Sequence, residues 1–177
     1  MLLRDVAAEA YGHERFYRFI MVVNGLTDEK KIPAEKTIQT PSIAAAFHDA
    51  GLDPRYQPAI NALAKAAMEF QATLPTYLRA REASGVSQGT FAIPKDIRST
   101  FSSQADAIAA VKGVLNKTHS PHQRPTLTIQ HLEQAETWIR ILAQGEIDGL
   151  GYDYDFVGQH MALSLSCAFV WMKESYQ

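Results

Sequence analysis

The feature that most constrains the fold is an uncharged stretch near the C-terminus, MALSLSCAFVWM (Met161–Met172). It lies within a segment, about Phe156–Ser175, that is predicted to be helical and is apolar nearly all round. A helix without a polar face has to be covered by other helices, so this one is predicted to be the most buried member of a bundle. The run is too short to cross a bilayer, which takes about 20 apolar residues.

Three earlier segments carry apolar residues at spacings of three and four, the pattern of one helix face. The first follows the breaker-rich stretch Gly51–Pro58, the second begins at Pro94 or Asp96, and the third spans Thr128–Gln144. Short connections favour antiparallel neighbours. Residues 51–177 are therefore predicted to form an antiparallel helical bundle of about four helices. The three faces are Ile60, Leu63, Ala67, Phe70, Leu74 and Tyr77; Ile97, Phe101, Ala105, Ile108, Val111 and Leu115; and Ile129, Leu132, Ala135, Ile139 and Leu142.

Prolines and glycines mark the breaks between these helices. Pro75 lies inside the first pattern and is predicted to kink or end that helix just before it. Ser84–Pro94 is predicted to be a loop, Thr118–Thr126 a break with two prolines, and Gly145–Asp155 a turn-rich link.

Residues 1–50 are predicted to form a small helix-helix-strand segment, packed on or linked to the bundle. Short helices fit Leu3–Tyr11 and Glu14–Asn24, each followed by a glycine that suits the position past a helix end. Lys36–Pro41 alternates in polarity and contains β-prone residues, so it is predicted to be a short strand. Ser42–Ala50 is predicted to be a further helical turn or two. The fold class is therefore mainly α.

Charge and cysteine content exclude some classes of protein. The formal net charge is −2 and charged residues make up 20% of the chain, so no nucleic-acid partner is expected. The single cysteine, Cys167, excludes an intramolecular disulfide framework and a cysteine-based zinc site. Arg4, Asp5 and Glu9 interrupt any signal-peptide apolar region. We expect either a cytoplasmic protein or a periplasmic or cell-envelope protein whose export signal has been removed.

Histidines and carboxylates supply the candidates for chemistry. His119 and His122, with His131 nearby, could share a zinc ion, although a proline-rich loop also fits two exposed histidines. Asp153 and Asp155 could form an acid–base pair, or could cap a helix start and interact with its dipole.

Three other side chains are expected to have structural roles. Glu136, with its neighbour Glu133, fits a solvated helix face, His160 fits a hydrogen-bonded core or edge position, and Cys167 fits a buried, inert one. The sequence contains no Gly-x-Ser-x-Gly, P-loop or Gly-x-Gly-x-x-Gly motif. These observations favour a non-catalytic protein without a cofactor.

The N-terminal segment carries a spaced set of residues that plain helix stops do not explain. They are Leu3, Val6, Ala7, Tyr11-Gly12, Ile20, Asn24, Leu26, Ile32, Ile38 and Pro41. With these residues the segment resembles a LysM module. That family has a strand, two helices and a second strand, and it binds N-acetylglucosamine-containing glycans such as peptidoglycan or chitin.

The resemblance spans residues 1–41 and lacks the family's first strand, whose Gly-Asp-Thr loop would precede Leu3. It also departs at Ala34-Glu35, where the family has Pro-Gly, and at Thr40, where it has an apolar residue. In the family, the sugar groove lies between the loop before the first helix and the loop after the second. The resemblance therefore implies glycan contacts from Gly25, Leu26, Thr27, Asp28 and Ile32.

Two functions are compatible with these patterns. The first is a non-catalytic binding protein, associated with cell-wall glycan through the LysM-like segment, whose helical bundle contacts a protein partner. The alternative is a soluble helical adaptor or regulator, or a phage-tail-like assembly protein, without glycan binding.

Overall fold

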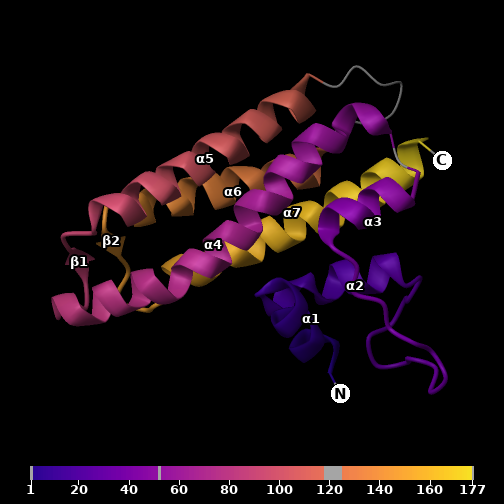
Figure 1. Cartoon of the computed structure of the whole chain (residues 1–177), viewed down its shortest axis with the longest axis horizontal. Helices are drawn as coiled ribbons and strands as arrows, with labels where there is room; N and C mark the ends of the chain where they lie inside the picture. Colours follow the sequence, from indigo (N-terminus) through magenta and orange to yellow (C-terminus); the bar gives the residue numbers. More distant parts are fainter. Residues whose placement is uncertain (1, 52, 118–124, 177) are drawn as a thin grey trace.

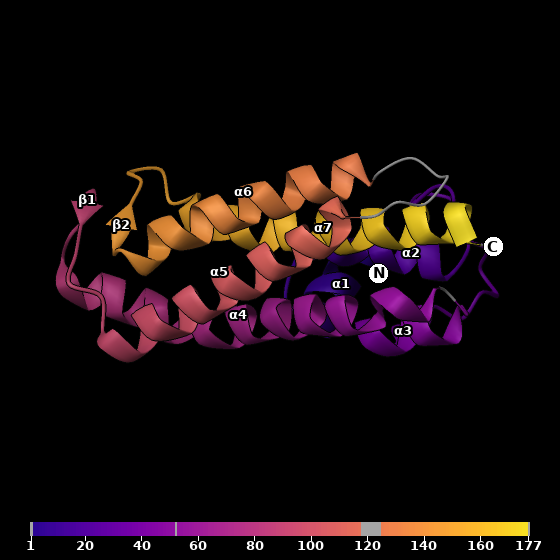
Figure 2. The same ribbon diagram turned by 90° about the horizontal axis from the view of Figure 1, so that it is seen from above.

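The computed structural model describes residues 2–51, 53–117 and 125–176, and this part of the chain is mainly α-helical, as the sequence predicts. Four long helices form an antiparallel bundle in which each packs on the next and the last closes against the first (Figures 1 and 2). They are α4 (Gln57–Ser84), α5 (Lys95–Asn116), α6 (Thr126–Ala143) and α7 (Asp153–Tyr176).

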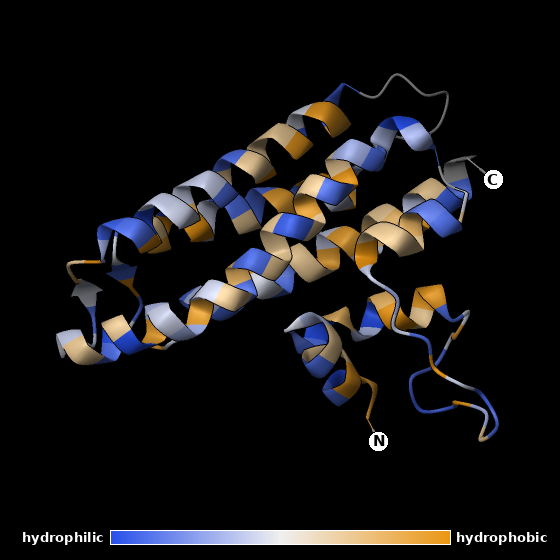
Figure 3. Ribbon diagram, in the orientation of Figure 1, coloured by the Kyte–Doolittle hydropathy of each residue, from blue (hydrophilic) through white to orange (hydrophobic). Residues whose placement is uncertain are grey.

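The interior of the bundle is built from the predicted apolar faces. Phe70 and Tyr77 of α4 meet Phe101 of α5 with ring centroids 5.5 and 5.4 Å apart, and all three side chains are fully buried. Apolar and polar residues alternate along each helix in Figure 3, as expected for helices with one buried face. None of the helices in the described ranges combines the length and hydrophobicity that a membrane span requires.

Pro75 does not end its helix, so that part of the prediction is wrong. Helix α4 runs without a break from Gln57 to Ser84 with Pro75 inside it. A proline in a helix interior removes one hydrogen bond and crowds the carbonyl four residues earlier. Here the neighbouring turns are held by tertiary packing, because Phe70 and Tyr77 on either side of Pro75 are fully buried. Burial of these aromatic residues therefore outweighs the local preference of proline.

A two-stranded antiparallel sheet lies at one end of the bundle, within the two segments predicted as a loop and a link. Strand β1 (Gly89–Thr90) pairs with β2 (Glu146–Ile147). Gly145, just before β2, has a φ of +76°, and a Cβ there would collide with the carbonyl oxygen of Phe91. Only glycine fits at this position.

The N-terminal segment packs on the side of the bundle (Figure 1). The ring of Phe19 lies 6.1 Å from that of Phe47 and 5.8 Å from that of Phe169, measured between centroids. Buried residues of the segment and of the bundle form one continuous core. The domain boundary at residue 50 stays a prediction. The segment consists of α1 (Leu3–Tyr11), the 3₁₀ turn η1 (Glu14–Phe16), α2 (Tyr17–Val23) and α3 (Ile43–Asp49), and the turn η2 (Pro54–Tyr56) leads into α4.

The predicted strand at Lys36–Pro41 does not form, and this is a second correction. No strand of the described residues lies beside it, and one side chain takes over the role of a strand partner. The Oδ1 of Asn24 accepts the backbone N–H of Gln39 at 2.8 Å, and its Nδ2 donates to the carbonyl of Gln39 at 2.9 Å. The hydroxyl of Tyr11 donates to the carbonyl of Pro41 at 2.6 Å. These bonds fix the returning segment against α1 and α2 without a ladder.

Candidate functional site

A groove of about 500 Å³ lies between the start of α1 and the loop that follows α2. We call it the N-terminal groove. Helix α1 supplies one wall and is fixed by its buried face, which includes Ala7 and Tyr11. The loop supplies the other wall and is held at its far end by Asn24. The groove is lined by Leu2, Leu3, Arg4, Glu29, Lys30 and Ile32.

Local hydrogen bonds shape the loop wall of the groove. Gly25, with a φ of +67°, ends α2 and lets the N–H of Leu26 donate to the carbonyl of Met21 at 2.8 Å. The carboxylate of Asp28 then accepts the N–H of Lys30 at 2.9 Å, which closes a tight turn. The chain leaves this turn so that Ile32 lies against the start of α1.

The charges of the N-terminal groove largely compensate one another. Arg4 lies 3.8 Å from a carboxylate oxygen of Glu29 and 3.8 Å from one of Glu14. Its guanidinium also lies 4.2 Å from the ring centroid of Tyr17. The side chain of Leu2 is 67% exposed beside these charges. The groove thus offers apolar surface next to paired polar groups, which suits a neutral polar ligand better than an ion.

Of the five residues expected to contact glycan, only Ile32 lines the N-terminal groove. Leu26 packs against the core, and Asp28 holds the turn. Gly25 and Thr27 are exposed outside the groove. The wall formed by Leu2, Leu3 and Arg4 was not predicted from the sequence. The one sequence signal for this wall is the apolar pair Leu2-Leu3 directly before the first charged residue, Arg4.

The predicted histidine site is tested only in part, because His119 and His122 lie outside the described residues. The Nδ1 atoms of His131 on α6 and His160 on α7 lie 3.0 Å apart, so one ring donates a proton and the other accepts it. Within the described ranges, no three His, Cys, Asp or Glu side chains converge to hold a metal ion. The hydrogen bond of His160 agrees with the structural role predicted for it.

Burial and nearby charge lower the pKa of both histidines. Burial lowers the pKa of His131, and the positive charge of Arg18 lowers it further. Burial also lowers the pKa of His160, with an additional contribution from His131. Both pKa values therefore lie below the ordinary 6.5.

This pair predicts that acid destabilises the protein. Because both pKa values are lower in the folded state, the unfolded state binds more protons near pH 6. The contribution of the histidine pair to the free energy of unfolding is therefore complete above pH 6.5 and is lost as the pH falls through the folded-state pKa values. We expect the free energy of unfolding, measured with urea at pH 7.5 and 5.5, to fall less in His160→Gln than in the wild type. The exposed-residue variant His48→Gln is the control, and an equal fall in all three proteins would contradict the prediction.

Asp153 and Asp155 do not form a pair. The carboxylate of Asp153 is fully buried and accepts from Arg81 at 2.8 and 3.1 Å. Asp155 instead faces Nε2 of His13 at 2.8 Å. The Nδ1 of His13 accepts the N–H of Arg15, so Nε2 carries the proton and donates to Asp155. The two carboxylates thus serve different structural contacts in the first turn of α7, and the predicted pairing of Asp153 with Asp155 is wrong.

The glutamate prediction holds for one of two residues. Glu133 is exposed, as expected. Glu136 instead accepts from Lys112 of α5 at 2.9 Å and from Arg140 at 3.1 Å. Burial alone would raise the pKa of Glu136, but these two cations lower it below its ordinary value. Glu136 therefore joins α5 to α6.

The chain was compared with family models, with curated proteins and with solved structures, and none of the three comparisons finds a match.

Proposed function

We propose that the protein is a non-catalytic binding protein whose LysM-like segment, residues 1–41, binds an N-acetylglucosamine-containing glycan in the N-terminal groove. One observation carries the proposal. The groove lies between the start of α1 and the loop after α2, which is where the resemblance places the sugar. The bundle then serves as the part of the molecule that contacts a protein partner.

The residues that carry the resemblance also give this segment its shape, which supports the proposal. Tyr11 and Asn24 hold the chain between Gln39 and Pro41 by side-chain hydrogen bonds. Gly12, with a φ of +83°, makes the turn between the two helices.

The chemistry of the groove suits an acetylated sugar. Leu2 and Ile32 offer apolar surface for the C–H face of the ring and for the acetamido methyl group. Glu29 accepts and Lys30 donates hydrogen bonds to hydroxyl groups. Ligand sites commonly combine apolar walls with a few polar groups that fix orientation.

Calorimetric titration with N-acetylglucosamine hexamer tests the proposal on the full chain. We expect saturable heat for the wild type and at least tenfold weaker binding for Leu2→Asp, because a charge would replace apolar contact. Leu150→Asp is a matched control, since Leu150 is 77% exposed and lies outside the groove.

Two results would each contradict glycan binding. The first is no binding heat from the wild-type protein, tested together with any native residues that precede Met1. The second is an equal loss of affinity in Leu2→Asp and Leu150→Asp. Self-assembly in light scattering without sugar affinity would instead favour the assembly-protein alternative.

A further inference from the structure

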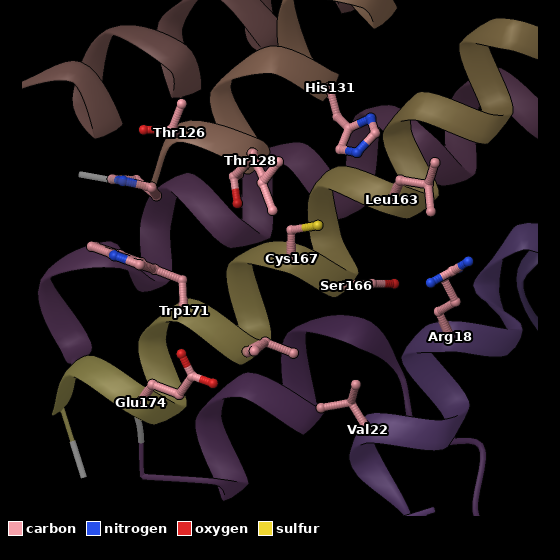
Figure 4. A pocket seen from close by; sticks show the side chains of 13 residues that line it. Arg18, Val22, Thr126, Thr128, His131, Leu163, Ser166, Cys167, Trp171 and Glu174 are labelled. Atoms are coloured by element: carbon pink, nitrogen blue, oxygen red, sulfur yellow. The ribbon is translucent and has the colours of Figure 1, made fainter. Parts of the chain in front are cut away.

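A second and larger groove, of about 890 Å³, opens between α2, the first turn of α6 and one face of α7 (Figure 4). We call it the inter-helix groove. It is separate from the N-terminal groove, because the two share no lining residue. Its volume lies in the range of small-molecule sites, about 300–1,000 Å³.

The walls of the inter-helix groove are mostly apolar. The apolar lining comes from Val22 of α2, from Leu163, Val170 and Trp171 of α7, and from Leu127 of α6. Leu127 and Val170 are large apolar residues that remain exposed. Apolar surface of this kind is stabilised when a ligand removes it from water, at about 25 cal/mol per Å².

One positive charge dominates one side of the groove. Arg18 forms no ion pair with a described residue, and the ring of Tyr17, with its centroid 5.5 Å away, is a weak partner. Its charge reaches across the groove: burial lowers the pKa of His131 and Arg18 lowers it further, while burial raises the pKa of Cys167 and Arg18 partly opposes that rise. Glu174 lies away from Arg18 in Figure 4, so an anionic group is favoured at the Arg18 side only.

From these contacts we propose that the inter-helix groove binds a linear acyl carboxylate. The carboxylate lies at the guanidinium of Arg18, on the side of the groove where that residue stands in Figure 4. The chain follows Val22, Val170 and Trp171. A single guanidinium binds a carboxylate through two parallel hydrogen bonds, which matches one anionic head on an apolar tail.

Fluorescence of Trp171 provides a direct test. The chain has two tryptophans, and the other one, Trp138, contacts Phe156 outside the groove, so Trp138→Phe isolates the signal of Trp171. Dodecanoate, titrated below its micelle concentration, should change the emission of Trp171 saturably. Arg18→Gln should weaken binding at least tenfold, whereas Arg79→Gln, which removes the same charge from an exposed position on α4, should not.

A second readout uses the only cysteine of the chain. Cys167 lines the groove and is half-buried. Saturating dodecanoate should slow its alkylation by iodoacetamide severalfold in the wild type and not in Arg18→Gln.

A comparison with dodecanol separates the contribution of the head group to binding from that of the tail. The proposal expects dodecanoate to bind the wild type at least tenfold more tightly than dodecanol, and this preference should vanish in Arg18→Gln. No saturable response to dodecanoate, or equal affinities for the two compounds in the wild type, would overturn it.

Discussion

Replacing Asp153 with alanine should lower the free energy of unfolding by about 3–5 kcal/mol, the usual effect of removing one member of a buried ion pair. The carboxylate is fully buried, and the side chain of Arg81 is only 14% exposed. Burial would lower the pKa of Arg81, but its hydrogen bonds to Asp153 hold that pKa above the ordinary value. The substitution would leave a charged guanidinium in the interior without its partner.

Loss of hydrogen bonds adds to the effect. Asp153 also accepts the backbone N–H groups of Asp148 and Tyr154, at 3.3 and 3.0 Å. Urea unfolding should therefore separate Asp153→Ala clearly from Asp155→Ala, whose carboxylate is 51% exposed and for which we expect about 1 kcal/mol or less. Similar losses in the two variants would show that the buried pair contributes little.

A compensating variant distinguishes a lost charge partner from lost packing. Arg81→Met combined with Asp153→Leu should recover part of the stability, because neither charge then remains buried. If the double variant is no more stable than Asp153→Ala, packing and backbone hydrogen bonds account for the loss.

Phe19→Ala should cost about 3–5 kcal/mol and should affect the whole molecule. The ring is fully buried and contacts Tyr11 and Phe16 within its own segment. It also contacts Phe169 of α7, with centroids 5.8 Å apart. Removing the ring opens a cavity where the N-terminal segment meets the bundle.

Two probes should detect one shifted transition. Tryptophan fluorescence reports on α6 and α7, and far-UV circular dichroism reports on all helices, so both midpoints should fall together. Val114→Ala, at a position that is 44% exposed, should stay within about 0.5 kcal/mol of the wild type. A bundle transition that does not move in Phe19→Ala would mean that residues 1–50 unfold on their own.

Helix positions could be predicted because they depend on local patterns. Leu3–Tyr11 is confirmed to the residue, since an apolar face and the glycine after it are both visible in sequence. Long-range packing explains the failures. At Pro75 the burial of neighbouring aromatic residues decides the outcome, and Lys36–Pro41 has no strand beside it to pair with.

The candidate sites were harder to predict because each joins distant parts of the chain. Arg81 and Asp153 are separated by 72 positions, so no local spacing reveals their pairing. The contact between His131 and His160 likewise requires α6 and α7 to be side by side. Each groove depends on two or three segments that meet only after folding, so single residues such as Ile32 were found and the opposite walls were not.

The two hydrogen bonds between the Asn24 side chain and Gln39 make residues 25–38 tolerant of changes in length, which pairing in a strand ladder would not do. The segment is tied at both ends, so it forms a nearly closed ring. Lengthening such a ring costs little, about 0.6 kcal/mol for each doubling. Insertions within this ring should therefore cost little stability, because the Asn24 side chain keeps its two ends together.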